Sequence, residues 1–266
     1  MPGSGTIPGQ ALSRRRPRSS TSRATLQQQE GEEAATDPRA ARAPAEIAAS
    51  VEVEDFVAPG AGYRRGVDDT ICLTYDDGPS PDWTPRILKA LRRRAARATF
   101  FVQARRAVEC PEQVERILAA GHEVGFHCLD HIRHSQRSAE GVESDLTIGL
   151  EMLARIGVRP RAWRAPWGIE TDATRLLAAE HDLRLWGWNV DTHDWRGDSV
   201  RRMFDALQAQ GGVRAGDVIL MHDALGPGAR RDDCGQTVAL TELLLATAER
   251  AELLTATVSA GEGVLA

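Results

Sequence analysis

Short apolar runs alternate with longer amphipathic segments along most of the chain, beginning near Asp68. The predicted strands are Ile71–Tyr75, Ala98–Val102, Glu123–His127, Ala162–Arg164, Leu183–Val190, Asp217–Met221 and Leu254–Val258. The predicted helices lie between them, at Thr84–Arg94, Pro111–Ala120, Ser138–Ile156, Thr171–His181, Ser199–Gln210 and Gln236–Glu249. Regular alternation of strand and helix is typical of parallel sheets, and seven units favour a barrel over an open sheet. The pattern therefore predicts an α/β barrel.

Residues 1–60 have a different composition from the rest of the chain. Gly, Pro, Ser, Gln and Ala dominate, arginines crowd positions 14–18, and large apolar side chains are few. Because so few apolar groups cannot offset the entropy of ordering, we expect a disordered tail over 1–60 and one folded domain over 66–262. An over-long start or a nucleic-acid-binding arm is the alternative interpretation of the tail. No apolar segment follows the arginines, as a secretion signal would require.

Composition excludes several other classes of protein. The 266 residues carry a formal net charge of −5, whereas a nucleic-acid surface needs a basic face. Cys72, Cys110, Cys128 and Cys234 are too widely spaced to indicate a zinc knuckle or a dense disulfide framework. No apolar run has the length of a membrane span. We expect a cytoplasmic protein without nucleic-acid or protein partners, with export as the open alternative.

Polar clusters follow the predicted strands at their carboxyl ends. Asp76-Asp77 ends the first strand, and His127 ends the third. Further clusters end the fourth, fifth and sixth strands, at Arg164–Gly168, Asp191–Trp195 and His222-Asp223. In α/β barrels this edge of the sheet carries the active site. The distribution therefore predicts an enzyme rather than scattered surface polarity.

Two adjacent carboxylates and two imidazoles in this set indicate a metal site. Asp76 and Asp77 repel each other unless a cation, a shared proton or solvent is near. His127 and His131 would add nitrogen to this oxygen, a combination that zinc accepts. Taken alone, the Asp-Asp-Gly-Pro string is a turn signal and the His pair an exposed helical pair. Together they predict a metallohydrolase.

His122-Glu123 together with His127 could suggest a zincin helix, but their spacing excludes it. In that motif the second His follows the first by four positions, and Phe126 stands four positions after His122. The run after His122 is also predicted as strand rather than helix.

The motifs resemble, in order, those of NodB-type polysaccharide deacetylases, the carbohydrate esterase family 4. The similar segments are Thr74–Gly78, His127–His131, Arg164–Gly168, Asp191–Trp195 and Leu220–Asp223, and the likeness extends from Asp68 to Val258. The resemblance implies a distorted (β/α)7 barrel, the NodB homology domain. It also implies metal-dependent hydrolysis of an acetamido group on an amino sugar.

The family pattern further implies a role for each matching residue. Asp77, His127 and His131 would hold a divalent metal, Zn²⁺ first, with Co²⁺, Ni²⁺ or Mn²⁺ as alternatives. Asp76 would be the general base, and Arg164 would pair with it. On an extended segment Asp76 and Asp77 would point in different directions, so only one would reach the metal.

The remaining family positions would complete the chemistry. The backbone N–H of Trp167 would stabilise the oxyanion, and His222 would protonate the departing amine. Asp191 would hydrogen-bond the His222 imidazole. Trp195 and Leu220 would wall the acetyl pocket.

Three residues depart from the family pattern without touching these roles, and one of them is Phe126, where the family often has Asn. Cys128 replaces Ser or Thr, and we expect its thiol to point away from the metal. Trp167 replaces Tyr or Phe, which would change only the shape of the cleft.

We therefore predict an N-deacetylase of an N-acetylated carbohydrate, such as a chitooligosaccharide or related glycan. An O-acetyl esterase is the alternative within catalysis. A non-catalytic sugar-binding barrel is the alternative outside it, and that class predicts damage to the ligands or to the acid–base pair. All of these residues are present.

Overall fold

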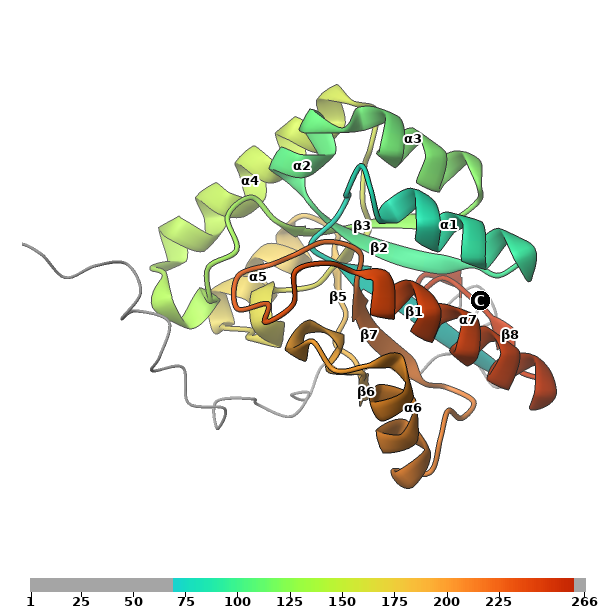
Figure 1. Ribbon diagram of the computed structural model, residues 1–266. Helices are drawn as coiled ribbons and strands as arrows, with labels where there is room; N and C mark the ends of the chain where they lie inside the picture. Colours follow the sequence, from blue (N-terminus) through green and yellow to red (C-terminus); the bar gives the residue numbers. More distant parts are fainter. Residues whose placement is uncertain (1–68, 261–266) are drawn as a thin grey trace, which may run out of the picture. The chain divides into compact units, whose positions relative to one another are not determined.

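The computed structural model describes residues 69–260, in which parallel strands form one curved sheet (Figure 1). The strands are β1 (Thr70–Asp76), β2 (Ala98–Gln103), β3 (Glu123–Cys128), β4 (Ala162–Trp163), β5 (Arg184–Leu185), β6 (Val190–Asp191), β7 (Val218–His222) and β8 (Leu254–Thr255). Their order across the sheet is β5-β4-β3-β2-β1-β7-β6, and β8 pairs with the start of β1. Every pairing is parallel, as predicted.

The sheet is a half-barrel rather than a closed ring. In the part of the chain that the structure describes, β5 and β6 end the strand order and do not pair with each other. This half-barrel is consistent with the distorted (β/α)7 barrel that the family resemblance implies.

The predicted strand Leu183–Val190 is wrong as a single element. It divides into β5 and β6, which lie at opposite edges of the sheet. Between them, the carbonyl oxygens of Trp186 and Gly187 accept hydrogen bonds from the Arg164 guanidinium. The segment between β5 and β6 therefore binds Arg164 through its carbonyl oxygens instead of continuing a strand.

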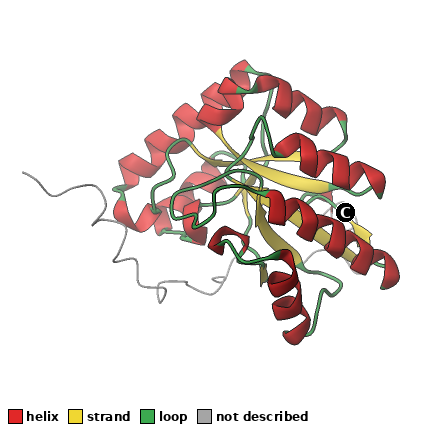
Figure 2. Ribbon diagram, in the orientation of Figure 1, coloured by secondary structure: helices red, strands yellow, loops and turns green. Residues whose placement is uncertain are grey.

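Helices cover the outside of the sheet (Figure 2). They are α1 (Thr84–Arg93), α2 (Ala104–Glu109), α3 (Pro111–Ala119), α4 (Ala139–Arg155), α5 (Asp172–Glu180), α6 (Val200–Ala209) and α7 (Gly235–Arg250). Prolines occupy the first turns of α1 and α3, where no N–H is needed. Ser138, Thr171 and Ser199 cap α4, α5 and α6 through their hydroxyls. Among the α-helices of residues 69–260, only α2 was not predicted, because its six residues are too few to show a helical period.

Strand side chains divide between two apolar clusters. The larger cluster joins the sheet to the helices and includes Tyr75, Phe100 and Phe126. The smaller one lies on the other face of the sheet and includes Phe101 and Leu220. Because successive strand residues point to opposite faces, the polar ends of β1 and β7 lie on this second face. The fold thus delivers its polar strand ends to the concave side.

Further predictions concern disulfides, membrane-spanning helices, the N-terminal tail and the location in the cell. All four cysteines are free, so no disulfide supports the fold. No helix within residues 69–260 is long and apolar enough to cross a membrane. The tail predicted for residues 1–60 lies outside the described residues, and the location in the cell stays a prediction.

Candidate active site

Strand register brings the polar strand ends together at one edge of the sheet. Asp76, the last residue of β1, pairs with Phe101 of β2 on one side and with His222 of β7 on the other. His127 lies near the end of β3, beyond β2. The predicted base, acid and metal ligands therefore share one end of the half-barrel.

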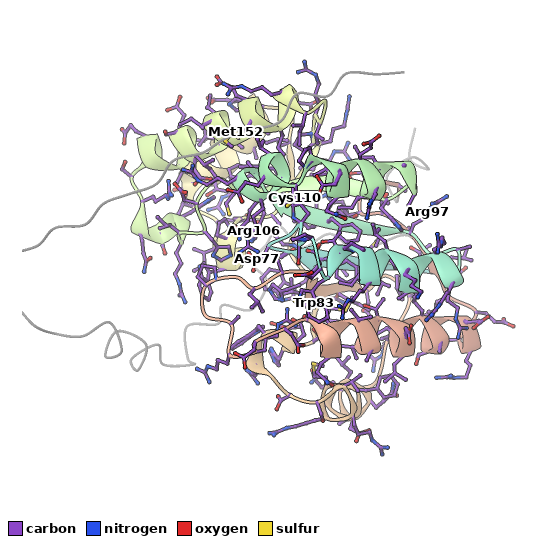
Figure 3. The ribbon with its side chains drawn as sticks, turned by 45° about the horizontal axis from the view of Figure 1, so that its top comes forward. Asp77, Trp83, Arg97, Arg106, Cys110 and Met152 are labelled. Atoms are coloured by element: carbon purple, nitrogen blue, oxygen red, sulfur yellow. The ribbon has the colours of Figure 1, made fainter. Side chains whose placement is uncertain are left out.

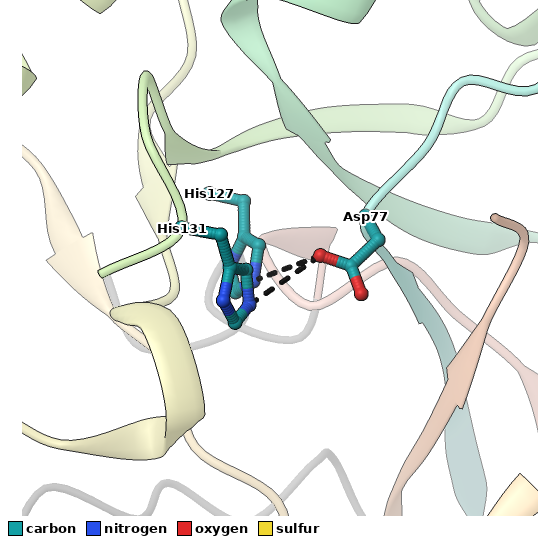
Figure 4. A group of neighbouring side chains, drawn as sticks. All are labelled: Asp77, His127 and His131. Atoms are coloured by element: carbon teal, nitrogen blue, oxygen red, sulfur yellow. Dashed lines mark ion pairs between the residues drawn. The ribbon is translucent and has the colours of Figure 1, made fainter. Parts of the chain in front are cut away.

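Asp77, His127 and His131 form a compact cluster of ligand atoms (Figure 4). Asp77 Oδ1 lies 3.7 Å from His127 Nε2 and 3.4 Å from His131 Nε2. Donors about 2 Å from one tetrahedral ion lie roughly 3.3 Å from one another, so the three atoms fit a single metal ion. This is the one group of three or more potential ligands within residues 69–260, and Cys128 is not part of it.

The hydrogen bonding of His127 and the protonation of His131 also fit a metal. His127 Nδ1 is 2.8 Å from the backbone oxygen of Arg164, which fixes the ring and leaves Nε2 to face Asp77. Burial lowers the pKa of His131 to about 4, in spite of the nearby Asp77 carboxylate. A neutral ring keeps a lone pair for a metal, so His131 is ready to bind one at neutral pH.

A buried carboxylate anchors the loop that carries His131. Asp145 of α4 accepts hydrogen bonds from the backbone N–H groups of Leu129 and Asp130, at 2.8 and 2.9 Å. Arg137 lies 3.2 Å from the same carboxylate and balances its charge. The sequence analysis did not single out Asp145, because a helical Asp far along the chain gives no local signal.

Asp76 and Asp77 diverge for a reason other than strand alternation. Asp76 is the last residue of β1, whereas Asp77 adopts a left-handed backbone conformation with φ of 72°. The extended backbone expected at Asp77 is therefore wrong. Gly78 follows within contact of the Asp223 carboxylate, so no side chain fits at Gly78. The turn itself, therefore, separates the two carboxylates.

Asp76 forms the predicted ion pair with Arg164. Arg164 Nη1 donates to Asp76 Oδ1 at 2.8 Å and to Thr74 Oγ1 at 2.7 Å. Its other nitrogens donate to the backbone of Trp186 and Gly187, and its side chain is fully buried. With each nitrogen in use, the guanidinium is fixed and holds the Asp76 carboxyl in one orientation.

The predicted hydrogen bond from His222 to Asp191 is wrong. His222 Nδ1 instead lies 2.7 Å from Asp194 Oδ1, and the His222 backbone N–H donates to Asp194 Oδ2 at 3.0 Å. Asp191 Oδ1 accepts from the backbone N–H of His193 and lies 3.0 Å from its ring. Both aspartates belong to one Asp-x-x-Asp-Trp motif, and only the turn after β6 determines which one reaches His222.

Asp194 controls the charge of His222. Burial alone would lower the pKa of His222, but the Asp194 carboxylate raises it to about 9. Arg231 and Thr237 donate to Asp194 Oδ2 at 3.0 and 2.7 Å and hold the carboxylate ionised. His222 is consequently protonated at neutral pH, as a general acid must be.

Arg231 is a residue of the site that the motifs did not predict. Its side chain is 5% exposed and also donates to the backbone oxygens of Asp194 and His222. The preceding residue, Arg230, instead lies over the Trp195 ring, with its Cζ 5.8 Å from the ring centroid. Only the fold distinguishes the buried member of this Arg-Arg pair from the exposed one.

The other predicted residues surround these groups without a tested role. Trp167 has φ of 61°, rare for a large side chain, and its ring lies edge-on to His131 at 5.3 Å. Leu220 is buried among the concave-face residues, and Trp195 is half-buried beside His193. The oxyanion role of the Trp167 N–H and the acetyl pocket of Trp195 and Leu220 stay predictions.

The fold and the site together are those of a metal-dependent hydrolase. Residues 64–186 match the sequence model of the family described as polysaccharide deacetylase. A peptidoglycan-N-acetylglucosamine deacetylase of Bacillus cereus is 33% identical over 177 residues, 66% of this chain and 79% of that protein. A chitooligosaccharide deacetylase of Bradyrhizobium is 33% identical over 180 residues, 65% of this chain and 81% of that protein.

Solved structures agree with the sequence relatives. A family 4 carbohydrate esterase from Streptomyces lividans, solved in complex with acetate, superposes with a TM-score of 0.64 at 28% identity. The superposition covers 75% of this chain and 96% of that one. The chain belongs to the polysaccharide deacetylase family, carbohydrate esterase family 4.

Proposed function

We propose that this protein is a metal-dependent N-deacetylase that releases acetate from an N-acetylated amino sugar within an oligosaccharide. The observation that carries the proposal is that three groups of residues with different chemistry lie at one edge of the sheet. They are a cluster of three potential metal ligands, a carboxyl group paired with a buried arginine, and a histidine whose pKa is raised to about 9. The named relatives act on peptidoglycan N-acetylglucosamine and on chitooligosaccharides, which supports this substrate class.

Each of these three groups has a distinct role in amide hydrolysis. A divalent ion at the cluster would polarise the amide carbonyl and lower the pKa of the attacking water. Asp76, oriented by its hydrogen bond from Arg164, accepts the proton of that water. The backbone N–H of Trp167 donates to the oxygen that gains charge in the transition state. His222 donates its proton to the nitrogen of the departing amine, which would otherwise leave as a poor anion.

Asp194 makes this proton donation possible at neutral pH. Because it raises the pKa of His222 to about 9, the proton is present when the amine departs. In the following turnover His222 recovers a proton from solvent, since it is not fully buried. In this proposal, Trp195 and Leu220 limit the acyl group to something as small as acetyl.

The donor set favours zinc among divalent ions. Two imidazoles and one carboxylate are borderline and hard ligands, a mixture that Zn²⁺ accepts readily and that Co²⁺, Ni²⁺ and Mn²⁺ also tolerate. Zinc is therefore our proposal for the bound ion.

Acetate release from N-acetylglucosamine oligomers tests the proposal. The purified protein is treated with a chelator, reloaded with Zn²⁺, and assayed for free amine and acetate. We expect activity only after reloading. An O-acetyl esterase would release acetate from acetylated xylan and leave the amide intact, and a sugar-binding barrel would release none from either.

A further inference from the structure

Asp77 is held in a conformation that few residues adopt without support. Its φ of 72° belongs to the left-handed region, where a side chain crowds the backbone. Such a conformation persists only where neighbouring groups fix it. The surroundings of Asp77 therefore indicate how this metal ligand is kept in place.

Gln103 contacts the Asp77 turn twice. Its side-chain Nε2 donates to Asp77 Oδ1 at 2.8 Å, and its backbone N–H donates to the oxygen of Gly78 at 2.9 Å. Gln103 is the last residue of β2, directly after a register shift between β2 and β3 that leaves His127 without a partner in β2. Such irregularities re-aim side chains beside active sites.

Arg106 holds the same turn from the first turn of α2. Its Nη1 donates to the backbone oxygen of Asp77 at 3.1 Å, and its Nη2 donates to that of Leu225 at 2.8 Å. Figure 3 shows Arg106 and Asp77 next to each other. One guanidinium thus joins the turn after β1 to the loop after β7.

Gly226 closes the other side of the carboxylate. A Cβ at Gly226 would lie 1.9 Å from Asp77 Oδ2, so this oxygen packs directly against the loop backbone. The other oxygen, Oδ1, faces both imidazoles and receives the Gln103 amide. The two carboxylate oxygens consequently have different environments before any metal arrives.

We propose that Gln103 and Arg106 are positioning residues that preset Asp77 as a monodentate ligand, with only Oδ1 offered to the metal. The proposal rests on the metal site of the proposed function. One bound oxygen instead of two leaves more coordination positions for water and substrate. Neither side chain is needed as core packing, because both are only partly buried. Their contacts converge on one turn, which sets them apart from ordinary surface residues.

Metal binding by two variants tests this role. Gln103→Leu removes the amide donor while keeping the volume, and Arg106→Gln removes the bridge between the two backbone oxygens. The controls are Gln208→Leu and Arg201→Gln, which change exposed residues of α6. For each protein, Zn²⁺ affinity is measured by competition with a chelator, the Co²⁺ visible spectrum is recorded, and the metal-free protein is melted.

We expect the two variants to bind Zn²⁺ about 10- to 100-fold more weakly, the usual effect of removing a partner of a metal ligand. Their metal-free melting temperatures should match those of the controls. The Co²⁺ spectrum of Gln103→Leu should lose intensity, because a carboxylate free to rotate can bind through both oxygens and raise the coordination number.

Affinities and spectra equal to those of the controls would overturn the proposal. So would a fall in metal-free stability large enough to account for the lost affinity. If the parent protein binds neither Zn²⁺ nor Co²⁺, the proposed function fails together with this inference. If the parent binds metal and both variants bind it equally well, the inference alone fails.

Discussion

Two histidines on the same edge of the sheet show opposite electrostatic behaviour. His131 is buried beside Asp77 without a short hydrogen bond to it, and burial lowers its pKa to about 4. His222 is largely enclosed, with 15% of its side chain exposed, but it is hydrogen-bonded to Asp194, which raises its pKa to about 9. One imidazole is therefore neutral and suited to bind a metal, and the other is charged and suited to donate a proton.

The two carboxylates explain the difference. Asp194 receives hydrogen bonds from the side chains of His222, Arg231 and Thr237, so both of its oxygens are occupied by protein donors. Asp77 receives one, from Gln103, and its Oδ1 still faces two imidazoles. A carboxylate whose two oxygens both accept hydrogen bonds from protein groups orients its histidine. A carboxylate that accepts fewer hydrogen bonds can still bind a cation.

Asp77→Ala should have the largest effect, because it removes the one carboxylate of the metal cluster. We expect loss of bound metal and loss of all measurable acetate release together. Metal analysis beside an acetate assay checks both. Full metal content in this variant would mean that the ligand set is assigned wrongly.

Asp76→Asn should separate proton transfer from metal binding. The amide cannot accept a proton, so turnover should fall on the order of a hundredfold to ten-thousandfold while metal content is unchanged. Arg164 also loses its charge partner in the buried pair, so a lower melting temperature is expected. A variant that loses its metal but keeps its melting temperature would place Asp76 among the ligands.

Asp194→Asn should act on the charge of His222. Without the carboxylate, burial is left as the dominant influence and lowers the pKa of His222. Because the proposed mechanism needs the protonated ring, activity should be lost as pH rises through that pKa. The basic limb of the pH–rate profile should therefore move to lower pH, with a loss of roughly a hundredfold at neutral pH. An unmoved limb would exclude the pairing as its cause.

Arg231→Gln should produce the smallest change in turnover. It removes one donor to Asp194, while Thr237 and the His222 backbone still hold the carboxylate. We expect a loss of roughly tenfold in turnover and a destabilisation of about 1–3 kcal/mol from the weakened buried network. The exposed Arg201→Gln variant is the matched control and should show neither change.

Local patterns predicted the parts of the molecule that depend on local sequence. Apolar runs placed β1, β2, β3 and β7 to within one residue at each end, because buried strands need continuous apolar side chains. The spacing of His127 and His131 after an Asp-Asp turn identified the metal cluster, because its ligands lie on two short segments.

Other parts depend on contacts between distant segments, and these escaped prediction. Asp191 and Asp194 are equivalent in sequence, and the left-handed conformation at His193 decides which one reaches His222. Gln103 becomes a partner of Asp77 only through the register shift between β2 and β3. The strand predicted at Leu183–Val190 is interrupted where the Arg164 guanidinium donates hydrogen bonds to the carbonyl oxygens of this segment. Arg164 lies earlier in the chain, outside the segment, so the segment's own sequence did not indicate the break.

The most direct test of the contrast between the two histidines is the metal content of His131→Ala and His222→Ala, purified and loaded with Zn²⁺ side by side. His131→Ala should retain little or no metal, whereas His222→Ala should bind one equivalent as the parent does, although both are inactive in acetate release. Equal metal content in the two variants, or metal lost from His222→Ala alone, would contradict the assignment of one imidazole to the metal and the other to the proton.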